Sequence, residues 1–358
     1  MAEHFLGKAS IKLSQGVEIL SSASVVGKKE GQGPLGALFD KVSEDDSFGA
    51  KTWEEAESTL QREAFGEAMR KAAVEAEEIR YLFAGDLLGQ SIASSFGIGT
   101  YQVPMFGVYG ACSTCGEALA LGAMMIDGGF ADKVACVTSS HFASAEREFR
   151  FPLEYGNQRP LSASWTVTGS GAFILGKGAG AGGEGRRAAG EGPRGEKPSG
   201  KCVKITGVTI GKIVDYGLKD SMNMGACMAP AAASTLLRHF EDFGRGPGDY
   251  DQIVTGDLGS IGQRALFTLL REKGVDVRGK HLDCGMMIYD QKEQDVHAGG
   301  SGCGCCAVTL SAYVLKQLEE GFWKRVLFLP TGALLSKTSF NEGKTVPGIC
   351  HAIVLETP

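Results

Sequence analysis

The amino-acid sequence repeats itself at long range, and this repeat limits the folds that the chain can adopt. The segments "IRYLFAGDLLGQ" (79–90) and "DQIVTGDLGSIGQ" (251–263) are both apolar, strand-like runs that end in Gly-Asp-Leu before a helix-forming stretch. Their aspartates, Asp86 and Asp257, lie 257 − 86 = 171 residues apart, which is close to half of the chain. A repeat of this length indicates two related structural units.

A second match supports the duplication. The stretches "DGGFADKV" (127–134) and "EEGFWKRV" (319–326) align at a constant offset of 321 − 129 = 192, and this offset places Cys112 on Gly304. Each match joins a glycine-rich segment to a following apolar run. We therefore predict a duplicated α/β half.

Strand-like and helix-like segments alternate within each half. Apolar runs at 133–140 ("KVACVTSS") and 325–333 ("RVLFLPTGA") favour buried strands, whereas 52–73 and 262–274 have the apolar spacing of helices. This alternation predicts mixed or parallel sheets with helices on both faces.

The composition changes between the two halves. Residues 176–201 ("GKGAGAGGEGRRAAGEGPRGEKPSGK") have almost no apolar side chains, so we expect a flexible, glycine- and arginine-rich insertion at 179–200. The predicted halves are then residues 1–178, which carry the Cys112 helix, and residues 201–358.

Charge and hydropathy exclude several classes of protein. A formal net charge of −6 provides no broad basic face, so we expect no nucleic-acid partner. No apolar run approaches the about 18–20 residues of a membrane span, and residues 1–24 lack the features of a signal peptide. We expect synthesis in the cytoplasm, where the 10 cysteines would stay reduced.

Cys112 is the strongest candidate for chemistry. It precedes an apolar helical segment in "YGACSTCGEALALGAMMIDGG" (109–129), and a buried helix N-terminus lowers a thiol pKa and attracts anions. A zinc site would have to pair Cys112 and Cys115 with distant cysteines at 303, 305 or 306. Because the local spacing is typical of packing, we expect no metal and no cofactor.

A nucleophilic cysteine needs a base, and histidine is the usual one. His141 at the end of a predicted strand and His297 before a glycine loop are the candidates, although a structural role is the simpler interpretation for each. Arginines in 144–160 could either pair locally or form a fork that closes on a carboxylated ligand.

Motifs along almost the whole chain from Gly33 resemble those of the stage V sporulation protein AD family, whose fold is thiolase-like. They include "GPLGALFDK", "AGDLLGQ", "YGACSTC", "TSSHFASAEREFRFPLEYG", "MAPAAA", "TGDLGSIG", "HAGGSGCGCCAV" and "VPGICHA". The resemblance implies duplicated halves in an αβαβα layered arrangement. The insertion after Gly176 is its main departure.

The more distant resemblance to condensing enzymes of this fold implies a lost activity. Their cysteine falls on Cys112, but the two helper positions fall on Gly256 and Gly299, which have no side chain for proton transfer. We therefore expect a non-enzymatic protein with Cys112 as a vestigial nucleophile. The alternative is an active acyltransferase or condensing enzyme that uses Cys112, with His297 or His141 as base.

The family resemblance implies binding of dipicolinic acid (pyridine-2,6-dicarboxylate), for its uptake into the developing spore and its release in germination. The implied partners are other proteins of the stage V sporulation A membrane complex, and fold analogy implies a homodimer. The resemblance also implies synthesis in the cytoplasm of the forespore and a peripheral position at the spore inner membrane. The residues that we expect to bind the ligand are Cys112, Ser113, Asp86, Gln90, Ser140, His141, Asp257, His297, Gly299 and Gly300.

Overall fold

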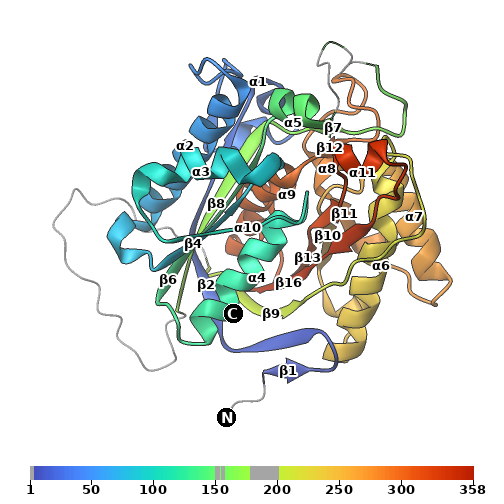
Figure 1. The fold of residues 1–358 in the computed structure, drawn as a ribbon. Coiled ribbons are helices and arrows are strands. Elements are labelled where there is room, and N and C mark those ends of the chain that lie inside the picture. Colours follow the sequence, from blue (N-terminus) through green and yellow to red (C-terminus); the bar gives the residue numbers. More distant parts are fainter. Residues whose placement is uncertain (1–3, 150–153, 155–157, 178–200) are drawn as a thin grey trace.

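The computed structural model describes residues 4–149, 154, 158–177 and 201–358, and its main feature is one mixed sheet of 12 strands (Figure 1). The path through this sheet is β11-β10-β13-β16-β9-β2-β8-β6-β4-β5, and short strands β1 (Phe5–Leu6) and β3 (Lys41–Val42) pair with β2. The strands of the path are β2 (Ser10–Val26), β4 (Tyr81–Gly85), β5 (Met105–Gly107), β6 (Lys133–Ser140), β8 (Gly169–Lys177), β9 (Lys204–Thr209), β10 (Gln252–Thr255), β11 (His281–Asp283), β13 (Arg325–Leu329) and β16 (Ala352–Glu356).

The sheet has the internal symmetry that the repeat predicts. From the centre outward, one half runs β2, β8, β6, β4, β5 and the other runs β9, β16, β13, β10, β11. In both halves the first two pairings are antiparallel and the next two are parallel. Antiparallel pairing of β2 with β9 joins the halves. The duplicated α/β organisation is therefore confirmed.

Helices form three layers around the two halves of the sheet. The central layer consists of α4 and α9, with α10 continuing from α9, while α2 and α3 cover one half and α6 and α7 cover the other (Figure 1). This is the predicted αβαβα arrangement. The bounds are α2 (Trp53–Ala72), α3 (Ile92–Ile98), α4 (Thr114–Asp127), α6 (Met224–Phe243), α7 (Gly259–Arg271), α9 (Cys303–Thr309) and α10 (Leu315–Glu319).

Local sequence explains where these elements begin and end. The Thr52 side chain accepts a hydrogen bond from the backbone of Glu55, which caps the N-terminus of α2, and Arg70 and Lys71 lie in its last turn. At the end of β13, Pro330 has no N–H to donate, so the predicted 325–333 strand stops at Leu329. The chain then enters a separate sheet.

Short elements bring distant segments of the chain together. β7 (Trp165–Thr166) pairs in parallel with β12 (Gly300–Ser301), and β14 (Thr331–Ala333) pairs with β15 (Gly348–Cys350). The remaining short helices are α1 (Lys28–Gly31), α5 (Phe142–Phe149), α8 (Cys284–Met287) and α11 (Lys337–Asn341). The predicted insertion at 179–200 lies outside the described residues.

Close packing of β8 against α9 leads to a stability prediction. A Cβ atom at Gly171 would lie 2.6 Å from the Cβ of Ala307 and 2.7 Å from its carbonyl carbon. Gly171→Ala should therefore lower the free energy of unfolding by about 1–3 kcal/mol through overpacking. Urea denaturation followed by circular dichroism would measure this loss.

Gly107→Ala is the matched control, because Gly107 is also a strand glycine but has no atom within 4 Å of a built Cβ. It should leave the urea midpoint unchanged or raise it slightly, since alanine restricts the unfolded chain. Equal loss of stability in both variants would contradict the packing argument.

Candidate functional site

Cys112 lies in a tight turn that leads into α4. Ala111 has a positive φ of 51°, and the Thr114 hydroxyl donates to the Ala111 carbonyl at 2.6 Å. The Ser113 hydroxyl donates to the carbonyl oxygen of Gly110 at 2.7 Å, and the Ser113 N–H donates to the same oxygen at 3.1 Å. These bonds hold the turn and place the Cys112 side chain against the wall of a pocket.

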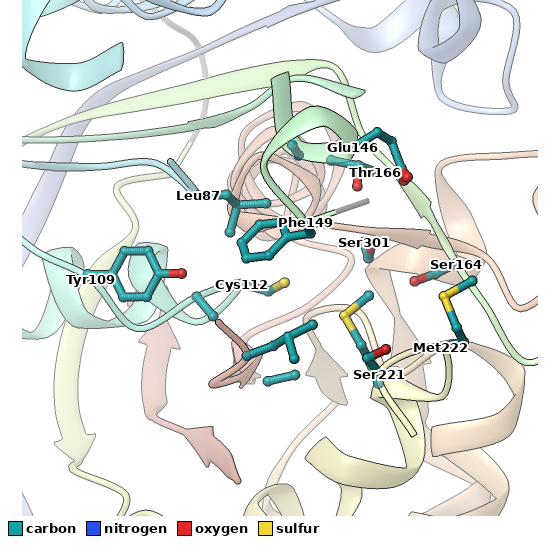
Figure 2. A pocket seen from close by; sticks show the side chains of 15 residues that line it. Leu87, Tyr109, Cys112, Glu146, Phe149, Ser164, Thr166, Ser221, Met222 and Ser301 are labelled. Carbon is teal, nitrogen blue, oxygen red and sulfur yellow. The ribbon is translucent and has the colours of Figure 1, made fainter. Parts of the chain in front are cut away.

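The pocket over Cys112 has a cavity of about 80 Å³ and is open at its mouth, so it is smaller than the about 300–1,000 Å³ of typical small-molecule sites. Figure 2 shows the Phe149 ring next to the Cys112 thiol, and these two residues share an apolar cluster with Leu87. Residues from both halves line it: Leu87, Tyr109, Ala111, Cys112, Ala145, Glu146, Phe149, Ser164, Thr166, Ser221, Met222, Met224, Ser301, Ala333 and Leu335.

The lining combines apolar walls with hydroxyl groups. Its hydroxyl-bearing side chains are those of Ser164, Thr166, Ser221, Ser301 and Tyr109. Glu146 is the one charged residue, and the described lining contains no lysine, arginine or histidine. Such a surface suits a small ligand with a flat apolar body and polar substituents.

Asp257 lies directly behind the thiol of Cys112. Its carboxylate accepts hydrogen bonds from the Thr331 hydroxyl and from the Gly302 N–H, both at 2.9 Å, and it is also hydrogen-bonded to the Cys112 side chain. Asp257 as a whole is 2 % exposed. Cys112 and Asp257, both of which we predicted as site residues, therefore form a buried acid–thiol pair.

Burial controls the electrostatics of this pair. Removal of the Cys112 thiol from water is the main cause that raises its pKa well above the usual value, and the nearby Asp257 carboxylate raises this pKa further. The prediction that the helix N-terminus lowers this pKa is wrong, because desolvation outweighs the dipole. Burial also raises the pKa of Asp257 to about 7, against the hydrogen bonds that favour its charged form.

The two glycines that we expect at the helper positions, Gly256 and Gly299, leave no room for side chains. A Cβ at Gly256 would lie 2.9 Å from the backbone nitrogen of Thr331. Gly299 has a φ of 128°, and a Cβ there would lie 2.7 Å from the carbonyl oxygen of Gly285. Neither position supplies a proton-transfer group to Cys112 in this structure.

In the other half of the fold, the surroundings of Asp86 correspond to those of Asp257, and they are filled by protein atoms. Asp86, at the end of β4, accepts from the N–H of Leu88 and from the N–H and hydroxyl of Ser94, at 2.9, 2.8 and 2.6 Å. A Cβ at Gly304, which the repeat aligns with Cys112, would lie 2.2 Å from the carbonyl oxygen of Gly169. Asp86 does not line the pocket and stabilises its own turn.

Other predicted site residues lie outside the pocket lining. Gln90 is exposed, and the Ser140 hydroxyl donates to the carbonyl oxygen of Val167 at 2.7 Å. His141 is buried, its Nε2 lies 2.7 Å from the carbonyl oxygen of Asp46, and burial lowers its pKa. Gly300 pairs with Trp165 in the small sheet.

His297 is also held away from the thiol. Its Nδ1 lies 2.9 Å from the carbonyl oxygen of Pro160, and its Nε2 lies 3.1 Å from a carboxylate oxygen of Asp295. Arg159 donates to the carbonyl oxygen of the same Asp295 at 2.8 Å. Neither residue lines the described pocket, and Arg150 lies outside the described residues.

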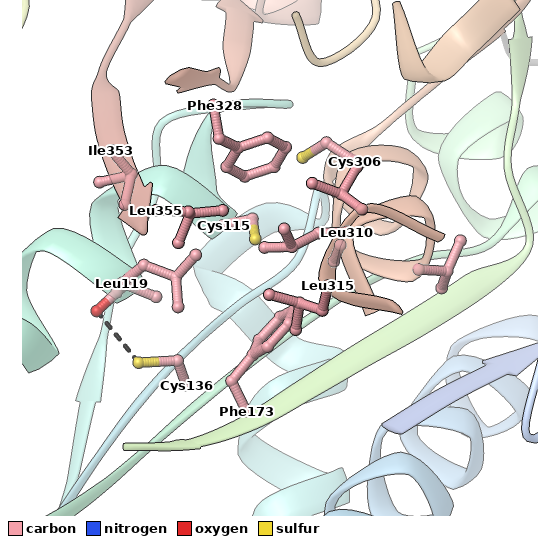
Figure 3. Close-up of a cluster of buried hydrophobic side chains, with 14 of the residues drawn as sticks. Cys115, Leu119, Cys136, Phe173, Cys306, Leu310, Leu315, Phe328, Ile353 and Leu355 are labelled. Atoms are coloured by element: carbon pink, nitrogen blue, oxygen red, sulfur yellow. Dashed lines mark hydrogen bonds between the residues drawn. The ribbon is translucent and has the colours of Figure 1, made fainter. Parts of the chain in front are cut away.

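The cysteines near Cys112 pack in the central layer. Figure 3 shows Cys115 and Cys306 among Leu119, Leu310 and Phe328. Within the described ranges, no three His, Cys, Asp or Glu side chains converge as metal ligands would. Likewise, no helix in the described part of the chain is long and apolar enough to cross a membrane.

Much of the lining of the Cys112 pocket was not predicted from the sequence. Tyr109 lies three residues before Cys112 and Ser301 directly follows Gly300, so their positions in the same motifs were a usable signal. Ser221 and Met222 had none, because their segment reaches the pocket only through tertiary contacts such as the bond from the Ser162 hydroxyl to the Met222 carbonyl oxygen, 3.2 Å long.

The fold and the Cys112 pocket define a protein of the thiolase-like class. A crystal structure of Xanthomonas campestris OleA matches with a TM-score of 0.58 and 16% identity, over 96% of this chain and 99% of that one. The 3-oxoacyl-(acyl-carrier-protein) synthase III of Aquifex aeolicus matches with a TM-score of 0.54 and 14% identity, over 95% and 100% of the two chains. At these identities the similarity establishes the fold alone.

Sequence comparison identifies the family. The family described as Stage V sporulation protein AD matches residues 7–356. The Stage V sporulation protein AD of Bacillus subtilis (strain 168) is 40% identical over 350 residues, which cover 98% of this chain and 97% of the relative. The chain belongs to the stage V sporulation protein AD family.

The acid–thiol pair leads to a prediction about reactivity. Cys112 should react with iodoacetamide at pH 8 at least about tenfold more slowly than free cysteine, because little of it is thiolate. Asp257→Asn removes a negative charge that raises the Cys112 pKa, so its alkylation profile should shift to lower pH. Mass spectrometry of the Cys112 peptide measures both rates, and Cys112→Ser identifies that peptide. Identical profiles would contradict this electrostatic account.

Proposed function

We propose that this chain binds dipicolinic acid in the pocket over Cys112 and does not transfer acyl groups. The carrying observation is the combination of an open pocket at Cys112 with closed backbone at Gly256 and Gly299. A site of this form keeps space for a ligand but has no side chain at either helper position. Membership of the sporulation family supports the choice of ligand.

The chemistry of the lining is compatible with this ligand. The pyridine ring would lie against apolar side chains such as Phe149, Met222 and Leu335. Hydroxyl groups, including those of Ser164, Thr166 and Ser301, are donors for its two carboxylates. The narrow space beside Cys112 favours a small planar molecule over a long acyl chain.

The proposed role is to carry dipicolinate during its uptake into the developing spore and its release in germination. In this proposal the chain is made in the forespore and acts as a peripheral protein at the spore inner membrane. Integral proteins of the stage V sporulation A complex are its proposed partners. By analogy with its fold, we propose a homodimer.

Titration calorimetry tests the proposed ligand. Dipicolinate should bind with 1:1 stoichiometry, and pyridine-3,5-dicarboxylate should bind at least about tenfold more weakly, since its carboxylates point elsewhere. Ser221→Trp should reduce dipicolinate affinity at least about tenfold by filling the pocket. Ser95→Trp, at an exposed helix position that is not part of the lining, is the matched control and should bind normally. Equal binding of both isomers would refute the proposal.

Intact-mass spectrometry tests the absence of acyl transfer. After incubation with acetyl-CoA or a longer acyl-CoA, the mass of the protein should stay unchanged, because Cys112 is a buried thiol. An adduct that appears in the wild type and is abolished by Cys112→Ser would establish the acyltransferase alternative, with Asp257 as the adjacent base.

A further inference from the structure

The charges of the described residues around the pocket over Cys112 oppose the binding of an anion. Its one charged lining residue is Glu146, and the described lining has no cation. Asp257 lies one residue layer deeper, in contact with Cys112 and with the N–H of Gly302, which follows the lining residue Ser301. An ionised Asp257 would repel an anionic ligand through this thin wall, where low polarity strengthens the interaction.

The groups around Asp257 do not offset a negative charge. The titratable groups that face Asp257 are Cys112 before α4, Asp283 at the end of β11, Cys284 in α8, Cys305 and Cys306 in α9, and Cys350 in β15. Burial is the main cause that raises the pKa of the Cys112, Cys284, Cys305 and Cys350 thiols. The pKa of Cys306 is raised first by its hydrogen bond with Cys115 and then by burial. All of these cysteines are therefore uncharged near neutral pH. Asp283 adds negative potential.

Hydrogen bonds act in the opposite direction. The Thr331 hydroxyl and the Gly302 N–H donate to the two carboxylate oxygens, and the Cys112 side chain bonds to the same group. These donors stabilise the charged form, whereas complete burial destabilises it. Burial outweighs the hydrogen bonds, which raises the pKa of Asp257 from its ordinary value to about 7.

We propose that Asp257 is the proton-binding residue of this pocket, and that an anionic ligand binds together with one proton taken up by Asp257. This inference rests on the proposed function of the pocket as a dicarboxylate site. Protonation removes the charge that opposes the ligand. By reciprocal linkage, the bound anion makes Asp257 harder to ionise.

The sign of the pH dependence follows directly. Below the pKa of Asp257 the pocket is competent for an anion, and as pH rises through about 7 the competent fraction falls. If only the protonated form binds, the apparent Kd at pH 8 should be about tenfold that at pH 6. Raising the pH would therefore weaken the binding of the ligand.

Calorimetry with dipicolinate between pH 6 and 8.5, in two buffers of different ionisation enthalpy, tests this inference. Wild-type protein should take up close to one proton per ligand at pH 8 and almost none at pH 6. This measurement needs no variant. Binding with the same Kd and no proton uptake throughout would overturn the inference and leave the proposed function intact, whereas no binding at any pH would overturn both.

Two isosteric variants assign the proton. Asp257→Asn should abolish both the proton uptake and the tenfold pH effect, and circular dichroism with a thermal melt checks that this variant is folded. Glu146→Gln, which removes the charge of the lining itself, should retain both effects. If Glu146→Gln abolishes the pH effect while Asp257→Asn keeps it, the assignment to Asp257 is wrong.

Discussion

Antiparallel pairing of β2 with β9 is the contact on which the rest of this structure depends. It joins the two halves of the sheet at their inner edges, with pairs such as Ser10 with Thr209 and Val17 with Ile205. The helices α4 and α9 are enclosed only because both halves are held around them. The starts of these helices meet below the pocket, where the Cys306 thiol approaches the carbonyl oxygen of Cys112 at 3.7 Å.

Desolvation determines the chemistry at that meeting point. A helix N-terminus stabilises an anion by about 0.3–1 kcal/mol when exposed and by about 2 kcal/mol at most. Full burial shifts a pKa by up to about 3–5 units, each equivalent to about 1.4 kcal/mol. At Cys112 burial therefore wins, and a position that looks like that of a reactive thiolate holds a neutral thiol.

The fold was predictable because the repeat relates strands that are equivalent in space. The two Gly-Asp-Leu copies follow β4 and β10, which hold the same place in their halves. The pocket was less predictable. Cys112 and Asp257 belong to recognisable motifs, but Ser221 and Met222 reach the site through long-range contacts, and the degree of burial that sets each pKa is a property of the whole assembly.

The two related corners of the duplicated fold differ in what fills them. Near Asp86, the Gln61 side chain donates to the carbonyl oxygen of Gly85 and to the hydroxyls of Ser94 and Ser139, at 3.2, 2.9 and 2.9 Å. Near Asp257, the corresponding corner is hollow as far as Cys112. A duplicated fold thus has two equivalent positions for a cavity, and a few side chains determine which of them stays open. In such a scaffold a binding site can change sides during evolution while every strand stays in place.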